Sequence, residues 1–244
     1  MTTKLKKNDN KIAMKKTVII LSAIIFSTMQ VQAYDFSIQK IDSVKYFISK
    51  EKTNIQKRTL EEITNLEQAR KMLKGRVVRV KYDEETDECI EDELGNFISK
   101  IVCDNGKTYS YNSYQLLWFV AYYPQQDVLL CEGGHTSDVS FNLTTGAERE
   151  DVGNPRYYVY SSSEKYLLNG YDDGQECSAY FIQEKIGGQY QKIIFLERLF
   201  EDEIDFRFCW ILDAFWENDT ILNIITTKYP GEKHEKLYYR IVLK

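Results

Sequence analysis

Three side chains capable of covalent chemistry lie within eight residues near the middle of the chain. Cys131, His135 and Asp138 flank the glycines Gly133 and Gly134. A cysteine nucleophile can be activated by a histidine that a carboxylate orients, so these are the candidate catalytic residues. A nucleophile and its base usually come from separate elements, and no family signature of a cysteine nucleophile surrounds Cys131. The segment therefore favours a glycine turn between two strands, and we assign no catalytic residue.

Metal and cofactor motifs are absent from the sequence. It contains no Cys-x-x-Cys pair, no His-Glu-x-x-His motif and only two histidines, whereas zinc sites need closely spaced Cys and His ligands. The acidic run 83–88 lacks the central glycine and the final glutamate of a calcium loop. A phosphate-binding glycine loop and a Gly-x-Ser-x-Gly elbow are also missing. We therefore predict no metal and no cofactor, and no carboxylate pair stands out for glycoside cleavage.

Aromatic residues are abundant and gather in two segments, one near 157–160 and one near 210–216. Tyr and Trp anchor interfaces and stack on sugar rings, because they combine a wide apolar area with a polar tip. An acidic run immediately precedes the second segment and would suit a basic partner. The alternatives are core packing for the aromatic residues and a solvated loop for the acidic ones. The candidate binding residues are Tyr157, Tyr158, Tyr160, Trp210, Trp216, Glu201, Asp202 and Glu203.

The elements that must position these residues begin with a helical region over 34–74. Apolar residues recur at spacings of three and four over 36–49 and again over 60–74, which is the period of an amphipathic helix. Thr59 and Glu62 match a capping box at the start of the second helix, and Gly75 is a natural stop.

Beyond Gly75 the apolar period changes to two, which predicts strands. Segments 97–103 and 107–111 flank Asn105-Gly106, whose positive φ angles suit a tight hairpin turn. From 114 to the end the sequence predicts strands and turns only. The expected fold is mainly β: an antiparallel β meander, propeller-like or a sandwich, preceded by a short helical N-terminal region.

The first 33 residues have the order of a secretory signal peptide. A positive start at 14–16 precedes a mostly apolar stretch over 17–28, and Val31-Gln32-Ala33 resembles a cleavage site. The apolar stretch is shorter than the ~20 residues of a membrane-spanning helix; an uncleaved anchor is the alternative. The predicted divisions are 1–33, a signal peptide with an N-terminal extension; 34–74, a helical region; and 75–244, a β-rich domain.

Charge narrows the possible partners. The full chain of 244 residues is 43% hydrophobic and 28% charged, which is typical of a globular protein. Removing 1–33 takes away six Lys and one Asp and leaves 26 basic and 36 acidic residues, a net charge of −10. Such a protein repels nucleic acid and anionic lipid, and it favours basic partners.

Five cysteines are consistent with an oxidising compartment. Cys89 and Cys103 flank one expected hairpin at modest separation, so we predict that they form a disulfide. Cys131, Cys177 and Cys209 remain, and one thiol is left over. The alternative is that all five are reduced and buried.

These observations together favour an exported, periplasmic or secreted, non-enzymatic protein-binding module. An inhibitor or immunity-type protein against a basic lytic enzyme would fit the charge, the size and the missing catalytic set. A basic protein is the expected partner, a glycan is a possible one, and neither nucleic acid nor a stable membrane span is expected after signal cleavage. The alternatives are a cell-envelope hydrolase acting on glycan or peptide, and a structural or adhesive β module.

Overall fold

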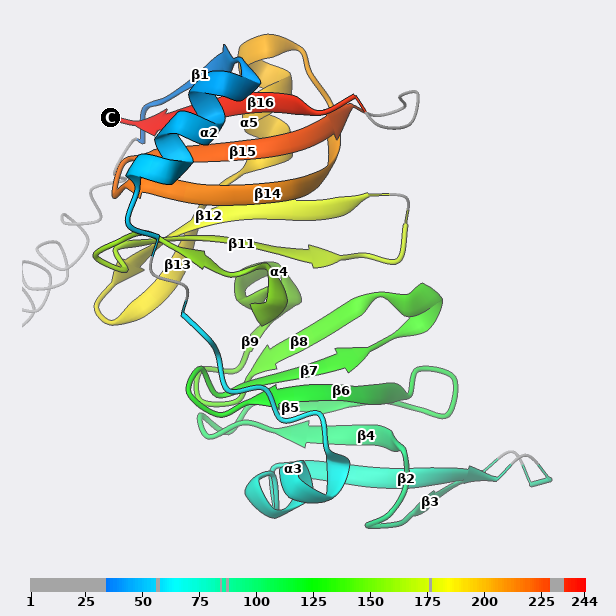
Figure 1. Ribbon diagram of the computed structural model, residues 1–244. Helices are drawn as coiled ribbons and strands as arrows, with labels where there is room; N and C mark the ends of the chain where they lie inside the picture. Colours follow the sequence, from blue (N-terminus) through cyan, green and yellow to red (C-terminus); the bar gives the residue numbers. More distant parts are fainter. Residues whose placement is uncertain (1–33, 56–57, 84, 87, 176, 229–234) are drawn as a thin grey trace, which may run out of the picture. The chain divides into compact units, whose positions relative to one another are not determined.

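The computed structural model describes residues 34–55, 58–83, 85–86, 88–175, 177–228 and 235–244 (Figure 1). The chain divides into the units Met1–Tyr34 and Asp35–Lys244, and every strand and helix named below belongs to the second unit. The predicted signal peptide lies outside the described residues, as do positions 84 and 87 of the acidic run 83–88. Within the described part, no helix is both long and apolar enough to cross a membrane.

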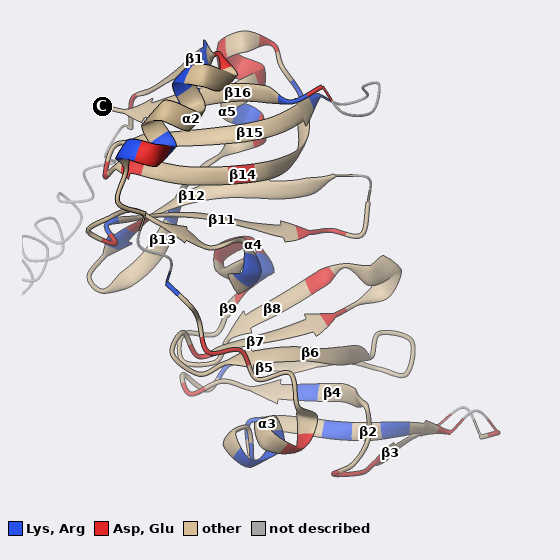
Figure 2. Cartoon of the chain, in the orientation of Figure 1, with Lys and Arg blue, Asp and Glu red and all other residues tan. Residues whose placement is uncertain are grey.

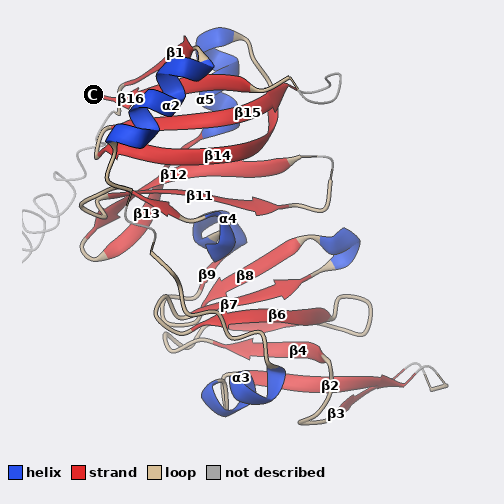
Figure 3. Cartoon of the chain, in the orientation of Figure 1, coloured by secondary structure: helices blue, strands red, loops and turns tan. Residues whose placement is uncertain are grey.

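Three antiparallel sheets make up this unit, which confirms a mainly β fold with few helices (Figure 3). The first sheet has the order β3 (Glu88–Glu91), β2 (Val77–Asp83), β4 (Phe97–Val102), β6 (Leu117–Tyr123), β7 (Val128–Glu132), β8 (Asp138–Asn142) and β9 (Ala147–Glu148), with β5 (Thr108–Ser110) paired to β4. The second has the order β10 (Val159–Tyr160), β11 (Tyr166–Asp172), β12 (Ser178–Ile186) and β13 (Gln189–Phe195). The third has the order β1 (Phe36–Ile41), β16 (Leu237–Leu243), β15 (Ile221–Lys228) and β14 (Phe208–Asn218).

The first predicted helix begins later than its apolar pattern suggested. Phe36–Ile41 forms β1, an edge strand that pairs with β16 from the other end of the chain. Helix α2 covers only Ser43–Lys52, and the Asp42 carboxylate caps it by accepting a hydrogen bond from the backbone N–H of Lys45 at 2.7 Å. The pairing with β16 is a long-range interaction, and a periodicity count over 36–49 does not include it.

The second predicted helix is also shorter than expected, because its proposed capping residue has other partners. Glu62 accepts hydrogen bonds from Tyr123 and Arg156 instead of closing a capping box. Ile63 forms an antiparallel bridge with Tyr122, and α3 then spans only Leu66–Met72. Its N-cap is Asn65, whose side chain accepts from the backbone N–H of Gln68.

A further helix, α5 (Leu196–Ile204), lies in the region where only strands and turns were predicted. The acidic run 201–203 belongs to this helix rather than to a loop. Leu196, Leu199 and Phe200 are buried at the helical spacing of three and four. The same spacing is present in the sequence, but the strand patterns on both sides of the segment led to a prediction of strands and turns there. Three single-turn elements complete the fold: α4 (Arg149–Val152), η1 (Gly134–Thr136) and η2 (Pro155–Tyr157).

Helices α2 and α5 pack on opposite faces of the third sheet (Figure 1). Tyr46 of α2 is fully buried and its ring lies 5.5 Å from that of Tyr238. Phe200 of α5 lies 5.1 Å from the ring of Tyr239. Successive residues of a strand point to opposite faces, so the adjacent tyrosines of β16 give each helix its own apolar surface.

The predicted Cys89–Cys103 disulfide is wrong: both cysteines are free thiols, and the disulfide joins Cys177 to Cys209. Cys89 lies opposite Tyr82 near one end of β2, whereas Cys103 follows Val102, whose N–H bonds to Arg76 at the other end. The two cysteines are therefore separated by roughly 20 Å along the sheet, far beyond bonding reach. The observed disulfide ties the start of β12 to β14, and so links the second sheet to the third.

Candidate functional site

The structure does not assemble the candidate catalytic residues. Cys131 lies in the middle of the first sheet and is completely buried, and burial raises the pKa of its thiol. His135 is exposed in the short turn η1, where it adopts a positive φ of 58°. Among the described residues, no hydrogen bond links Cys131, His135 and Asp138 to one another. A buried, protonated thiol without a base is a poor nucleophile.

Asp138 joins the first two sheets. Its Oδ2 accepts hydrogen bonds from the side-chain amide of Asn154 at 3.0 Å and from the backbone N–H of Asp172 at 2.8 Å. Close to this contact, Gly153 has a φ of 67°, and a Cβ there would lie 2.0 Å from the Oδ1 of Asn169. The carboxylate is thus a structural acceptor at a tightly packed junction.

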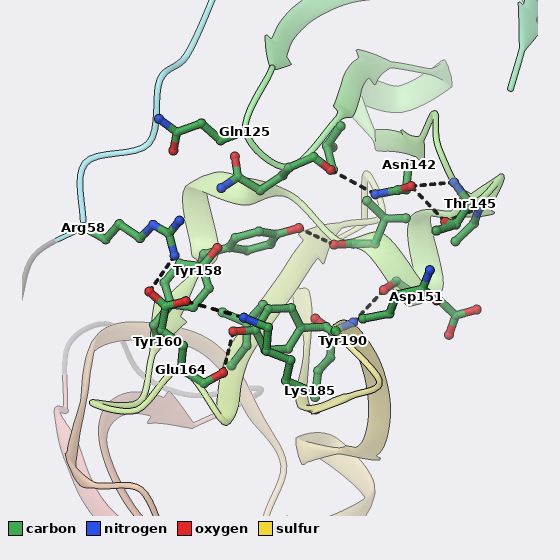
Figure 4. Close-up of a pocket in the computed structure, with 18 residues that line it drawn as sticks. Arg58, Gln125, Asn142, Thr145, Asp151, Tyr158, Tyr160, Glu164, Lys185 and Tyr190 are labelled. Atoms are coloured by element: carbon green, nitrogen blue, oxygen red, sulfur yellow. Dashed lines mark hydrogen bonds and ion pairs between the residues drawn. The ribbon is translucent and has the colours of Figure 1, made fainter. Parts of the chain in front are cut away.

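A pocket of about 410 Å³ is lined by residues of the first and second sheets (Figure 4). We call it the tyrosine pocket, because the rings of Tyr158, Tyr160 and Tyr190 line it. Its walls come from the turn before β7, the β8–β9 turn, α4 and strands of the second sheet, and Arg58 contributes from the connector between α2 and α3. Segments distant in the sequence therefore meet around one opening.

Three tyrosines hold fixed positions in the pocket wall. The hydroxyl of Tyr158 donates to the backbone carbonyl of Val152 at 2.8 Å, and that of Tyr190 donates to the carbonyl of Glu164 at 2.7 Å. The ring of Tyr160 lies between the other two, 5.9 Å from Tyr158 and 6.0 Å from Tyr190. The rings of Tyr158 and Tyr160 meet edge to face at 89°, and those of Tyr160 and Tyr190 are inclined at 56°.

Charged side chains at the pocket are paired with one another. Arg58 donates to Glu164 at 2.7 Å, and Lys185 lies 3.7 Å from the second oxygen of the same carboxylate. Arg58 also lies 5.1 Å from the ring centroid of Tyr160, and Lys185 lies 5.7 Å from that of Tyr190. With Asp151, the lining holds two cations and two carboxylates and is electrically neutral.

The pocket phenols are neutral hydrogen-bonding groups at physiological pH. Burial raises the pKa of Tyr160 to about 12, although Arg58 opposes the shift. Burial also raises the pKa values of Tyr158 and Tyr190 above the ordinary phenol range. A phenol with so high a pKa does not serve as a general base near pH 7, whereas it remains a donor and an apolar surface.

Five amide side chains line the same pocket. Those of Asn142 and Gln183 are engaged with the protein itself. In the described part of the chain, the exposed side chains of Gln125 and Gln189 make no hydrogen bond, and the buried Oε1 of Gln126 has no partner. The pocket therefore offers unused donors and acceptors next to aromatic rings.

The other predicted binding residues lie away from this pocket. Tyr157 packs against Tyr180, and Trp216 is buried with its Nε1 donating to the carbonyl of Val159 at 2.8 Å. Trp210 is 48% exposed on β14, and Leu212 beside it is 49% exposed. The acidic residues Glu201, Asp202 and Glu203 are exposed on α5, where Figure 2 shows acidic colour. The structure thus places Tyr158 and Tyr160 in the pocket and separates them from the remaining candidates.

A second pocket of about 520 Å³ lies between α3 and the strands β2 and β4. Its lining holds four cations, Arg70, Lys71, Lys74 and Arg79. The two arginines have partners: Arg79 donates to the carbonyls of Glu93 and Gly95, and Arg70 pairs with Glu67 and Glu93. No group of three His, Cys, Asp or Glu side chains that could hold a metal occurs among the described residues.

Sequence reasoning missed Arg58, Glu164, Lys185 and Tyr190. Arg58 and Glu164 are 106 residues apart, and no local motif marks either of them. Tyr190 follows Gly187-Gly188, the turn between β12 and β13, and no local motif marks it either. Comparison of the chain with protein-family models, with curated proteins and with solved structures finds no match.

Proposed function

We propose that the mature chain is an exported, non-enzymatic binding protein that holds its ligand in the tyrosine pocket. The observation that carries this proposal is the combination of three fixed, neutral phenols with unused amides around one opening. The volume of about 410 Å³ lies within the ~300–1,000 Å³ typical of ligand pockets. The internally paired charges at the rim need no added ion, so the pocket is ready to bind without further charge compensation.

Binding is favoured over catalysis by the chemistry of the candidate residues. The Cys131 thiol is buried and its pKa is raised, and the phenols of the pocket remain protonated. Near Trp216, Glu217 is engaged by Arg240 and by the amide of Asn223, so it is a structural acceptor. No specific observation favours the hydrolase alternative.

Export is supported by the signal-like order of residues 14–33 and by the disulfide between Cys177 and Cys209. Disulfides persist in the periplasm and outside the cell, whereas cytosolic proteins rarely contain stable ones. We therefore propose a periplasmic or secreted location.

A second candidate function is the capture of a basic protein, such as a lytic enzyme that this chain would inhibit. It is favoured by the half-exposed Trp210 and Leu212, which follow closely after the exposed acidic end of α5. An aromatic anchor next to acidic side chains suits a basic interface. This surface is separate from the tyrosine pocket in the sequence and in its lining residues, so single variants can distinguish the two functions.

Equilibrium dialysis tests the proposal. Residues 34–244 are dialysed against envelope and secreted extracts of the source organism, and the retained molecules are identified by mass spectrometry. We expect retention of a chemically unaltered molecule, its loss in Gln189→Trp, which fills the pocket rim, and unchanged retention in Trp210→Ala. Loss of retention in Trp210→Ala with high salt sensitivity would instead support the second candidate, and cleavage of the retained molecule would contradict a non-enzymatic role.

A further inference from the structure

We propose that the ligand of the tyrosine pocket is an uncharged saccharide, bound with its ring faces on Tyr160 and Tyr190. This inference rests on the proposed function and names its ligand class. The choice among ligand classes follows from the charge of the lining, from its aromatic rings and from its free amides.

The charge of the lining argues against ionic ligands. Arg58 and Lys185 share the carboxylate of Glu164, and Asp151 completes a lining of zero net charge. An anionic ligand would have to break these pairs to obtain a cation. A cationic ligand would have to displace Arg58 from the face of Tyr160, where the guanidinium lies 5.1 Å from the ring centroid. A neutral ligand needs no counter-charge, so it leaves the ion pairs of Glu164 intact.

The rings and the amides supply the two kinds of contact that a saccharide requires. A sugar ring has an apolar C–H face, which packs on an aromatic ring, and a rim of hydroxyls, each of which both donates and accepts hydrogen bonds. Tyr160 and Tyr190 are half-buried, with ring centroids 6.0 Å apart. The free amides of Gln125 and Gln189 lie among the lining residues and can bond such hydroxyls.

A purely apolar ligand does not fit this lining. Removing water from the amides of Gln125 and Gln189 without replacing their hydrogen bonds would cost free energy. The Oε1 of Gln126 is already without a partner. A ligand rich in hydroxyls offsets this cost, and an apolar one adds to it.

Isothermal titration calorimetry tests the inference with tetrasaccharides of β-1,4-glucan, α-1,4-glucan, chitin, xylan and mannan, and with any saccharide recovered by the dialysis. We expect at least one to bind wild type with an affinity that changes less than about twofold between 0.05 and 0.5 M NaCl, because a neutral ligand is not screened. Tyr190→Ala should weaken binding at least about tenfold. Tyr190→Phe keeps the ring and should remain within about threefold of wild type.

Two further variants, one outside the pocket and one at its rim, show whether a loss of saccharide binding is caused by misfolding. Trp210→Ala removes a distant exposed aromatic side chain and should bind as wild type. Gln189→Trp should abolish binding while the thermal midpoint stays unchanged, because residue 189 is exposed. Equal loss in Tyr190→Ala and Tyr190→Phe would overturn the stacking role of the ring.

The outcomes separate this inference from the proposed function. A retained molecule that depends on the pocket but contains no sugar would overturn the saccharide and leave the binding function intact. Retention of no molecule by wild type would overturn both. A recovered saccharide that binds Gln189→Trp as well as wild type would place its site outside the tyrosine pocket and overturn the inference.

Discussion

The disulfide between Cys177 and Cys209 is expected to be a major contribution to stability. It closes a loop with a sequence separation of 32. In the chain-entropy treatment, a loop of this length removes about 12 cal/mol/K from the unfolded chain, or about 3.7 kcal/mol at 25 °C. At about 2–4 °C per kcal/mol for a domain of this size, the double variant Cys177→Ala/Cys209→Ala should melt about 7–15 °C below wild type.

Thermal and urea unfolding, followed by circular dichroism, measure this loss. The matched control is Cys89→Ala, which removes a half-buried cysteine outside the bond and should lower the midpoint by no more than about 2 °C. Wild type treated with a reductant should resemble the double variant. A double variant that melts within about 3 °C of wild type, or a Cys89→Ala variant that loses as much, would refute the assigned pairing and the loop argument.

Three further predictions follow from individual side chains. Burial raises the pKa of Glu197 from 4.5 to about 7 in the folded state, so the folded protein binds the proton more tightly than the unfolded chain does. The free energy of unfolding should therefore fall as the pH rises from about 4.5 to about 7. Urea titrations at several pH values measure this fall, and Glu197→Gln should make it smaller. Iodoacetamide at pH 8 should label Cys89 well before the buried Cys131, which peptide mass mapping measures. Equal labelling rates of the two cysteines would contradict the burial of Cys131. Phe200 is fully buried, so Phe200→Ala should lower the free energy of unfolding by about 3–5 kcal/mol. Leu212 is half-exposed, so Leu212→Ala should lower it by less than about 0.5 kcal/mol. Comparable losses in the two variants would show that the packing of α5 is misassigned.

Local patterns predicted the local parts of the fold. The hairpin around Asn105-Gly106 is present as β4 and β5, and Gly106 has a positive φ of 86°. Asn105 does not have a positive φ, and residues 103–107 connect the strands, so the turn is not the two-residue type that was predicted. The mainly β character is likewise confirmed, and β16 shows the alternating burial that a period of two predicts, whereas β7 and β11 are buried along most of their length. Helix positions were less accurate where distant partners compete, as with Phe36–Ile41, which pairs with β16.

The disulfide and the pocket depend on contacts that no sequence window contains. Cys177 meets Cys209 only because β12 and β14 come together. Tyr158 and Tyr160 were identified as binding candidates from their aromatic character, but Arg58 and Tyr190 reach the same opening from segments far along the chain. Proximity in sequence was equally misleading for Cys131 and His135, since strand β7 buries the first and turn η1 exposes the second.

The most direct test of the central claim is an NMR titration of the protein with its tyrosine rings isotopically labelled. The chain has 18 tyrosines, and single Tyr→Phe variants assign the signals of Tyr158, Tyr160 and Tyr190. On addition of the ligand recovered by dialysis, we expect these three signals to shift and saturate together while those of distant rings such as Tyr46 stay fixed. Saturation of binding without any shift at these three rings would contradict a ligand site in the tyrosine pocket.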